Sequence, residues 1–150
     1  MEASLTWCEG MSFTANNRHH VTHLDASADF EGQDSAPTPK EVLLNAMMGC
    51  TAMDVVSILK KMRVEIKKFT MTIEAEKNLD PPVHFVKTHL VYYLDGDIAK
   101  DKAVKAIESS LTKYCGVNYM ISKVCDITYD LVLNGATAHT GMAAFVEPHR

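Results

Sequence analysis

A long apolar segment in the first half of the chain constrains the fold more than any other feature. Its start carries the signals of a helix N-terminus: Thr38 stands at the N-cap position, Pro39 at the first helical position, and Glu41 three residues after the cap. From there to about Met62, apolar residues are spread around most of the helix circumference. Such a helix must be buried on nearly all sides, and about 24 residues extend roughly 36 Å. We therefore expect it to run through the middle of the fold or through a dimer.

The rest of the chain predicts five strands and one further helix. Two strands precede the long helix, a second hairpin follows it, and an amphipathic helix then leads to the last strand. The expected strands cover residues 3–15, 20–28, 69–76, 85–94 and 124–133, and the second helix covers 99–114, ending at Cys115 with Gly116 as its C-terminal cap. The order ββ-α-ββ-α-β indicates an α+β fold with antiparallel sheets packed against the helices.

Length and charge restrict the class of protein. The chain has 150 residues, which corresponds to one domain. We place this domain over residues 1–134 and expect a loosely ordered tail over 135–150. The formal charge of -4 lacks the basic surface that neutralises phosphates, so we expect no nucleic-acid partner.

The N-terminal residues and the apolar segment bear on localisation. No basic region followed by an apolar one opens the chain, so a cytoplasmic protein is expected. The stretch from Val42 to Met62 is interrupted by polar and charged residues, and we therefore expect no membrane span. Four cysteines lie far apart in a chain that needs no disulfide to fold, which favours free thiols.

The cysteines are the first candidates for chemistry, because a thiolate is a nucleophile. Cys125 falls on an apolar strand face and Cys8 on a strand, and both are interpreted as packing residues. Cys50 lies too deep in the long helix for the helix dipole to activate it, and Asp54 one turn later disfavours a thiolate if it faces the sulfur. Cys115 ends its helix, which suits a thiol that attacks second. Sequence spacing alone does not bring Cys50 and Cys115 together.

Other patterns give weaker signals. His19, His20 and His23 are not spaced to share one ligand sphere on a strand, so no metal site is expected. The chain has no Gly-rich phosphate loop, no CxxC and no serine nucleophile elbow. No cofactor is expected.

Three segments resemble the OsmC/Ohr superfamily. Residues 36–61 (APTPKEVLLNAMMGCTAMDVVSILKK) are similar to its central helix, residues 113–117 (KYCGV) to its second cysteine motif, and residues 7–13 (WCEGMSF) to its start. With the matching element order, the resemblance covers about residues 1–134 and is nearest to the YhfA-like branch. It implies an intertwined homodimer with two active sites at the interface, which would explain a helix that is apolar all round.

The resemblance also implies a reaction. Cys50 would attack the O–O bond of an organic hydroperoxide to give a sulfenic acid, and Cys115 would condense with it to a disulfide. An external thiol would then reduce the disulfide. Arg18, in the first hairpin, falls near the family's activating arginine and would stabilise the Cys50 thiolate and bind the peroxide oxygen.

Two departures from the family pattern bear on this reaction. The hydroperoxide reductases carry, after the helix-opening proline, a glutamate that pairs with the arginine, whereas here that position is Lys40 and the acid follows at Glu41. One residue turns a helix by 100°, so Glu41 is kept as a supporting residue that caps the helix. Gly116 follows the second cysteine where those enzymes commonly have proline.

Two alternatives to a peroxidase stay open at this point. One is an OsmC-like stress protein that binds a small ligand and uses its cysteines weakly, as the Lys40 substitution would allow. The other is thiol chemistry on a different electrophile, such as a reactive sulfur species.

Overall fold

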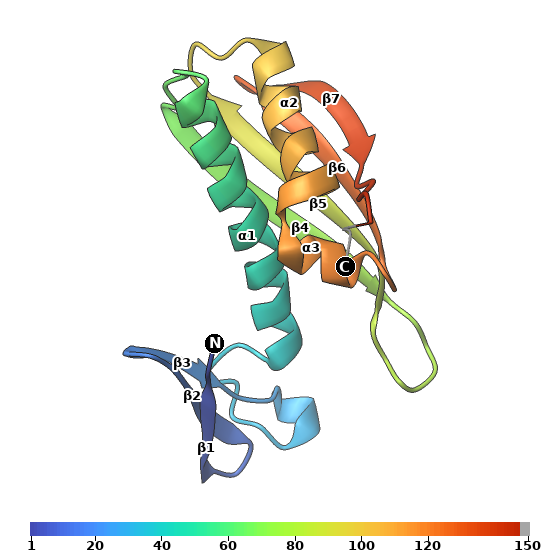
Figure 1. Ribbon diagram of the computed structural model, residues 1–150. Coiled ribbons are helices and arrows are strands. Elements are labelled where there is room, and N and C mark those ends of the chain that lie inside the picture. The colour runs from blue at the N-terminus through green and yellow to red at the C-terminus, as the bar shows by residue number, and fades with distance from the viewer. Residues whose placement is uncertain (148–150) are drawn as a thin grey trace. The chain divides into compact units, whose positions relative to one another are not determined.

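A computed structural model describes residues 1–147, which fall into two compact units, Met1–Asn45 and the chain from Ala46 onward (Figure 1). Helix α1 begins in the first unit and continues in the second. The fold combines helices with two separate sheets, so the α+β class is confirmed. The extent of one homologous domain over residues 1–134 stays a prediction.

The first unit holds a three-stranded antiparallel sheet in the order β1 (Ser4–Glu9), β2 (Ser12–Asn17) and β3 (His20–Leu24). The predicted single strand over 3–15 is therefore wrong, because the chain reverses within it. Gly10 occupies this turn with a φ of 53°, a backbone conformation that glycine adopts without steric cost. The short 3-10 helix η1 (Ala28–Phe30) follows the sheet.

Asp25 organises the loop between β3 and the long helix. Its carboxylate accepts hydrogen bonds from the backbone amides of Ala26, Gln33 and Ser35 and from the Ser35 hydroxyl. These bonds, led by the Ser35 hydroxyl, lower the pKa of Asp25, although its burial opposes the shift. A buried carboxylate that accepts this many hydrogen bonds stays ionised and fixes the loop.

Helix α1 (Pro39–Lys61) begins where the sequence predicts. The Thr38 amide and hydroxyl donate to Glu41 Oε2 at 2.7 and 2.8 Å, and the Glu41 amide donates back to Thr38 Oγ1 at 3.4 Å. This reciprocal pattern is a capping box. The Thr38 amide, followed by its hydroxyl, lowers the pKa of Glu41.

One face of α1 is buried within the chain. The buried residues recur every four positions, as one stripe of a helix does: Met47, Thr51, Val55 and Leu59. On other faces, Met53 is 75% exposed and Val56 is 42% exposed. The prediction that this helix is buried on nearly all sides is therefore not met within a single chain.

The second unit is built on a four-stranded sheet. Its strands lie in the order β4 (Lys68–Lys77), β5 (Phe85–Asp95), β6 (Asp126–Leu133) and β7 (Ala136–Met142). The pairs β4–β5 and β6–β7 are antiparallel, but β5 and β6 are parallel, which corrects the expectation of purely antiparallel sheets. The physical reason is the helical crossover between β5 and β6, since parallel neighbours need such a connection.

Strand β7 corrects a second expectation. Residues 136–142 pair with β6 instead of forming a loose tail, and the amides of Ala143, Ala144 and Val146 continue to donate to backbone carbonyls. Weak hydrophobic periodicity hid this edge strand, whose stability comes from backbone pairing. Residues 148–150 of the predicted tail lie outside the described residues.

The crossover also differs from the single helix predicted over 99–114. Helix α2 (Lys100–Ser109) passes into the π-helical turn η2 (Ser110–Tyr114), and after Cys115 the helix α3 (Gly116–Ile121) begins. Gly116 therefore opens a helix instead of ending one. Turns of this π-helical kind occur frequently at functional sites.

Helices α1 and α2 lie along one face of the β4–β7 sheet (Figure 1). Thr51 of α1 is hydrogen-bonded to Tyr92 of β5 and to Ser110 of η2, which fixes these three elements against one another. The core of this unit contains large side chains with almost no exposure: Tyr92, Tyr129, Leu90, Leu94, Ile107, Leu111, Ile127 and Leu131.

Helix α1 is long and apolar enough to cross a membrane by length and composition alone. A core helix passes the same test, and the buried stripe of α1 packs within this chain.

The capping box predicts the effect of a single substitution. Thr38→Ala removes the side-chain acceptor for the Glu41 amide and should lower the free energy of unfolding by about 1 kcal/mol. Urea unfolding followed by circular dichroism measures this change. Thr38→Ser keeps the hydroxyl and should stay close to the unchanged protein; equal stability of the alanine and serine variants would contradict the assignment.

Candidate active site

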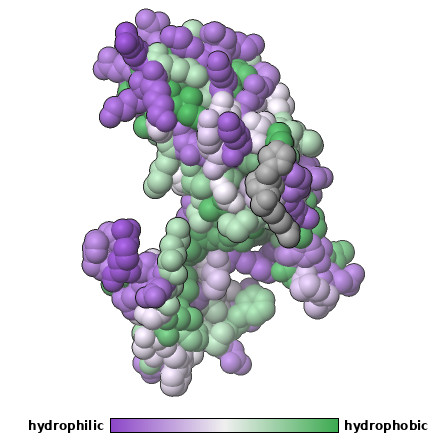
Figure 2. Space-filling model, viewed as in Figure 1, coloured by the Kyte–Doolittle hydropathy of each residue, from purple (hydrophilic) through white to green (hydrophobic). Residues whose placement is uncertain are grey.

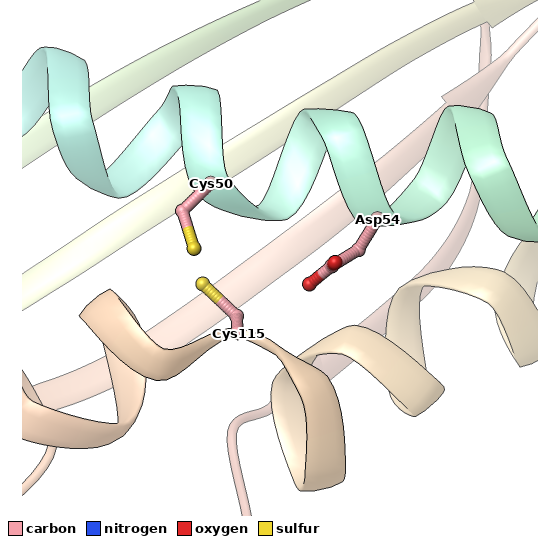
Figure 3. Close-up of side chains that lie close together, drawn as sticks. All are labelled: Cys50, Asp54 and Cys115. Carbon is pink, nitrogen blue, oxygen red and sulfur yellow. The ribbon is translucent and has the colours of Figure 1, made fainter.

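Two cysteines and one aspartate that are distant in the sequence meet in the second unit. The sulfur atoms of Cys50 and Cys115 and a carboxylate oxygen of Asp54 all lie within 4.8 Å of one another. Figure 3 shows the two thiols pointing toward each other from α1 and from the start of α3, with the Asp54 carboxylate beside them. The juxtaposition that sequence spacing left open is therefore present.

Helix geometry places Cys50 and Asp54. They are four residues apart on α1, so their side chains lie on the same helix face, one turn from each other. The buried Thr51, next to Cys50, fixes this part of α1 against the core. Cys50 itself is only partly buried.

Cys115 lies at the joint between η2 and α3. Its sulfur accepts hydrogen bonds from the Asn118 amide at 3.5 Å and from Asn118 Nδ2 at 3.2 Å, so it caps the N-terminus of α3. Asn118 Nδ2 also donates to the Met47 carbonyl of α1 at 3.2 Å, which ties the joint to the long helix. The sequence predicted only a helix C-terminus at this cysteine, which is incomplete because a second helix starts there.

The environment of Cys115 disfavours its thiolate. Burial is the main cause that raises the pKa of Cys115 to about 12, and the neighbouring Cys50 and the Asp54 charge add to it. The Asn118 amide acts in the opposite direction. Cys115 is therefore a protonated thiol near neutral pH.

Asp54 belongs to a chain of buried and half-buried hydroxyl groups. Ser110 Oγ lies 2.9 Å from Asp54 Oδ2 and 2.9 Å from Thr51 Oγ1, which lies 2.8 Å from the Tyr92 hydroxyl. A carboxylate only accepts and each hydroxyl carries one proton, so the arrangement that satisfies all four groups runs from Tyr92 through Thr51 and Ser110 to Asp54. Burial of Tyr92 raises its pKa, which keeps it a donor.

A cavity of about 320 Å³ adjoins the Asp54 side of this cluster. Ile58 and Met62 provide apolar lining, and Lys61 and Lys105 provide positive charge. The cavity gives a small molecule a route toward the carboxylate.

The other two predicted site residues lie in the first unit. Arg18 occupies the turn between β2 and β3, where it is exposed and has a φ of 59°. Glu41 is engaged by Thr38 in the capping box. The pairing of Arg18 with Cys50 stays a prediction.

The other two cysteines, Cys8 and Cys125, differ in burial. Cys125 is 4% exposed beside Thr88, which confirms its interpretation as a packing residue. The same interpretation of Cys8 is wrong, because Cys8 is exposed on β1 and contacts Thr14. All six residues of β1 are exposed within one chain, so neither face of this strand packs there.

Sequence reasoning missed the groups that hold the cluster in place. Ser110 and Asn118 carry no motif of their own, and both act through contacts with α1. One local signal was available for Asn118, since it stands three residues after Cys115, the spacing of an N-cap and the amide that it accepts from.

Comparisons with known proteins identify the family. Residues 32–130 match the OsmC-like protein family. "Protein YhfA" of Escherichia coli strain K12 is 34% identical over 131 residues, which is 86% of this chain and 95% of that protein. The chain therefore belongs to the OsmC-like family, as its sequence predicts.

Solved structures share the fold. A hypothetical protein from Aquifex aeolicus VF5 superposes with a TM-score of 0.75 at 22% identity, over 88% of this chain and 96% of that chain. An organic hydroperoxide resistance protein OsmC from Legionella pneumophila superposes with a TM-score of 0.68 at 13% identity, over 87% and 95%. At these identities the likeness is one of fold.

The thiol environments predict an order of alkylation. Iodoacetamide should modify exposed Cys8 and half-buried Cys50, whereas Cys115 and Cys125 should react at least about tenfold more slowly, because burial raises the pKa of both thiols. Peptide mapping over time measures the four rates. Cys115 should stay slow from neutral to mildly alkaline pH, since its pKa of about 12 lies above that range. A rate for Cys115 equal to that of Cys8 would be incompatible with this site.

Proposed function

We propose that this protein is a thiol-dependent peroxidase that reduces organic hydroperoxides through Cys50 and Cys115. The observation that carries the proposal is the approach of the two sulfur atoms to within 4.8 Å from separate elements. Membership of the OsmC-like family supports it, and a fold relative from Legionella pneumophila is called an organic hydroperoxide resistance protein.

In the first step, the Cys50 sulfur attacks the terminal peroxide oxygen. An S–O bond forms, the O–O bond breaks, and the alkoxide leaves as an alcohol after taking a proton. Cys50 is the better nucleophile of the pair because it is partly accessible, whereas Cys115 is fully buried and its pKa is about 12.

In the second step, the Cys115 sulfur attacks the sulfenic sulfur of Cys50. The S–S bond forms, the S–O bond breaks, and the hydroxyl leaves with the Cys115 proton as water. The Asp54 carboxylate lies within the same 4.8 Å and is the group that accepts this proton and returns it to the leaving hydroxyl. An external thiol, in two exchange steps, then reduces the disulfide.

Arg18 and Glu41 complete the proposed site. The Arg18 guanidinium would stabilise the Cys50 thiolate and bind the peroxide oxygen with charge-assisted hydrogen bonds. Glu41 supports the site by holding the start of α1 through Thr38. A cytoplasmic setting, where thiols are kept reduced, suits four cysteines that are all free thiols.

Cysteine substitutions test the proposed chemistry. With a dithiol reductant and cumene hydroperoxide, Cys50→Ser should lower peroxide consumption by at least about a thousandfold, because the attacking sulfur is gone. Cys115→Ser should still be oxidised once per chain, but without an intramolecular disulfide. Cys8→Ser is the matched control and should keep full activity.

Full activity of Cys50→Ser would refute the mechanism. If the unchanged protein were inert to peroxides but consumed a persulfide or another electrophile through Cys50, the alternative thiol chemistry would take its place. If all four thiols were inert, a ligand-binding role would be favoured.

We also propose a homodimer, with a second copy of the chain covering the apolar surfaces that one chain leaves exposed. Met53 and Val56 are exposed on α1. Figure 2 shows further apolar side chains on the visible face of the first unit. Within that unit, Leu5, Trp7 and Phe30 are more than half exposed. Exposed apolar residues in this number mark an interface.

Charge on the exposed face of α1 should disrupt such a dimer. Light scattering should give the unchanged protein about twice the 16.6 kDa chain mass, and Met53→Glu combined with Val56→Glu should shift it toward one chain mass. Lys100→Glu, on exposed α2 surface, is the matched control and should remain dimeric. A monomeric unchanged protein would contradict the proposal.

A further inference from the structure

We propose that Cys50, Asp54 and Cys115 form a binding site for one thiophilic divalent cation, of the zinc type, when both thiols are reduced. The three ligand atoms lie within 4.8 Å of one another, and they form the one group of three such side chains within residues 1–147. The inference concerns binding and does not depend on peroxidase activity.

The spacing on α1 suits a shared ligand. Two ligands at i and i+4 lie on one helix face, one turn apart, and this is the arrangement by which a helix presents two side chains to the same metal. Cys115 provides a third ligand from a different element, the N-cap of α3. Ligands from two elements close a site that one helix alone leaves open.

Two of the ligands are already held by hydrogen bonds of the kind that surround metal ligands. Ser110 donates to Asp54 Oδ2 at 2.9 Å, which orients the carboxylate and leaves its other oxygen for a cation. Asn118 donates to the Cys115 sulfur through its backbone amide and through Nδ2. Such bonds stabilise negative charge on a coordinated thiolate.

The donor set selects the class of metal. Two thiolates and one carboxylate favour Zn²⁺ over hard cations, which prefer oxygen ligands alone. In a tetrahedral zinc site these ligand atoms stand roughly 3.5–4 Å apart, so the side chains need to move by at most about 1 Å. The fourth tetrahedral position would be filled by water. Both sulfurs bind the cation as thiolates, so binding should weaken as the pH falls.

The cavity beside Asp54 gives the cation an entry path. Its lysines, Lys61 and Lys105, weaken cation entry through charge repulsion, which favours a moderate affinity over a permanent structural site. A bound cation occupies the lone pairs with which both sulfurs attack. The reduced site would therefore be protected while the metal is bound, and a Cys50–Cys115 disulfide would release it.

The test uses Co²⁺ as a spectroscopic probe for Zn²⁺. Metal-free, reduced full-length protein should bind one Co²⁺ per chain with a thiolate-to-cobalt charge-transfer band and the visible bands of tetrahedral cobalt, and Zn²⁺ should displace it. Cys50→Ser and Cys115→Ser should each lose about half of the charge-transfer intensity. Asp54→Asn should keep both thiolates but weaken binding by about tenfold or more.

Matched controls separate this site from adventitious binding. Cys8→Ser and Cys125→Ala should bind as the unchanged protein does, and the disulfide form should not bind. Absence of the charge-transfer band, or its loss in Cys8→Ser, would overturn the proposal.

The outcome is distinguishable from that of the peroxidase test. Protein that forms the disulfide with peroxide but binds no Co²⁺ keeps the proposed function and refutes the metal site. Protein that binds Co²⁺ through Cys50 and Cys115 but is inert to peroxide keeps the metal site and refutes the proposed function.

Discussion

The packing of one stripe of α1 determines where two thiols and a carboxylate meet. Met47, Thr51, Val55 and Leu59 enter the core, and Thr51 joins α1 to β5 and η2 by hydrogen bonds. Cys50 and Asp54 each precede a residue of this stripe, so fixing the stripe also fixes them. The Asn118 side chain then bridges the Met47 carbonyl and the Cys115 sulfur. The same contacts that stabilise the helix therefore bring two thiols and a carboxylate together.

The parts of the fold that depend on local interactions were predictable from sequence. Thr38 and Glu41 determine the start of α1 through a capping box, and strict alternation determines β4. The parts that depend on distant pairing were not. The edge strand β7 is held by backbone bonds to β6, and the parallel register of β5 and β6 follows from the crossover, neither of which has a local signature. The reversal at Gly10 was hidden by continuous alternation on both sides.

The candidate site was also only partly predictable from the sequence. Residue chemistry selected four cysteines, but the pairing of Cys50 with Cys115 came only from a family resemblance, because contact across long sequence separation leaves no pattern in one chain. Ser110 and Asn118 support the cluster through contacts with residues distant in the sequence, and no local pattern predicts these contacts. Asp54 was noticed for its spacing from Cys50, and the structure adds its proximity to Cys115. Arg18 remains assigned by resemblance.

The central claim is that Cys50 and Cys115 are one redox pair. The most direct measurement is the intact mass of the reduced protein before and after one equivalent of cumene hydroperoxide, with peptide mapping of any new disulfide. The account predicts the loss of two hydrogens per chain, mapped to a Cys50–Cys115 bond. An unchanged mass, beside a control peroxidase that is oxidised under the same conditions, or a disulfide that maps to Cys8 would contradict it.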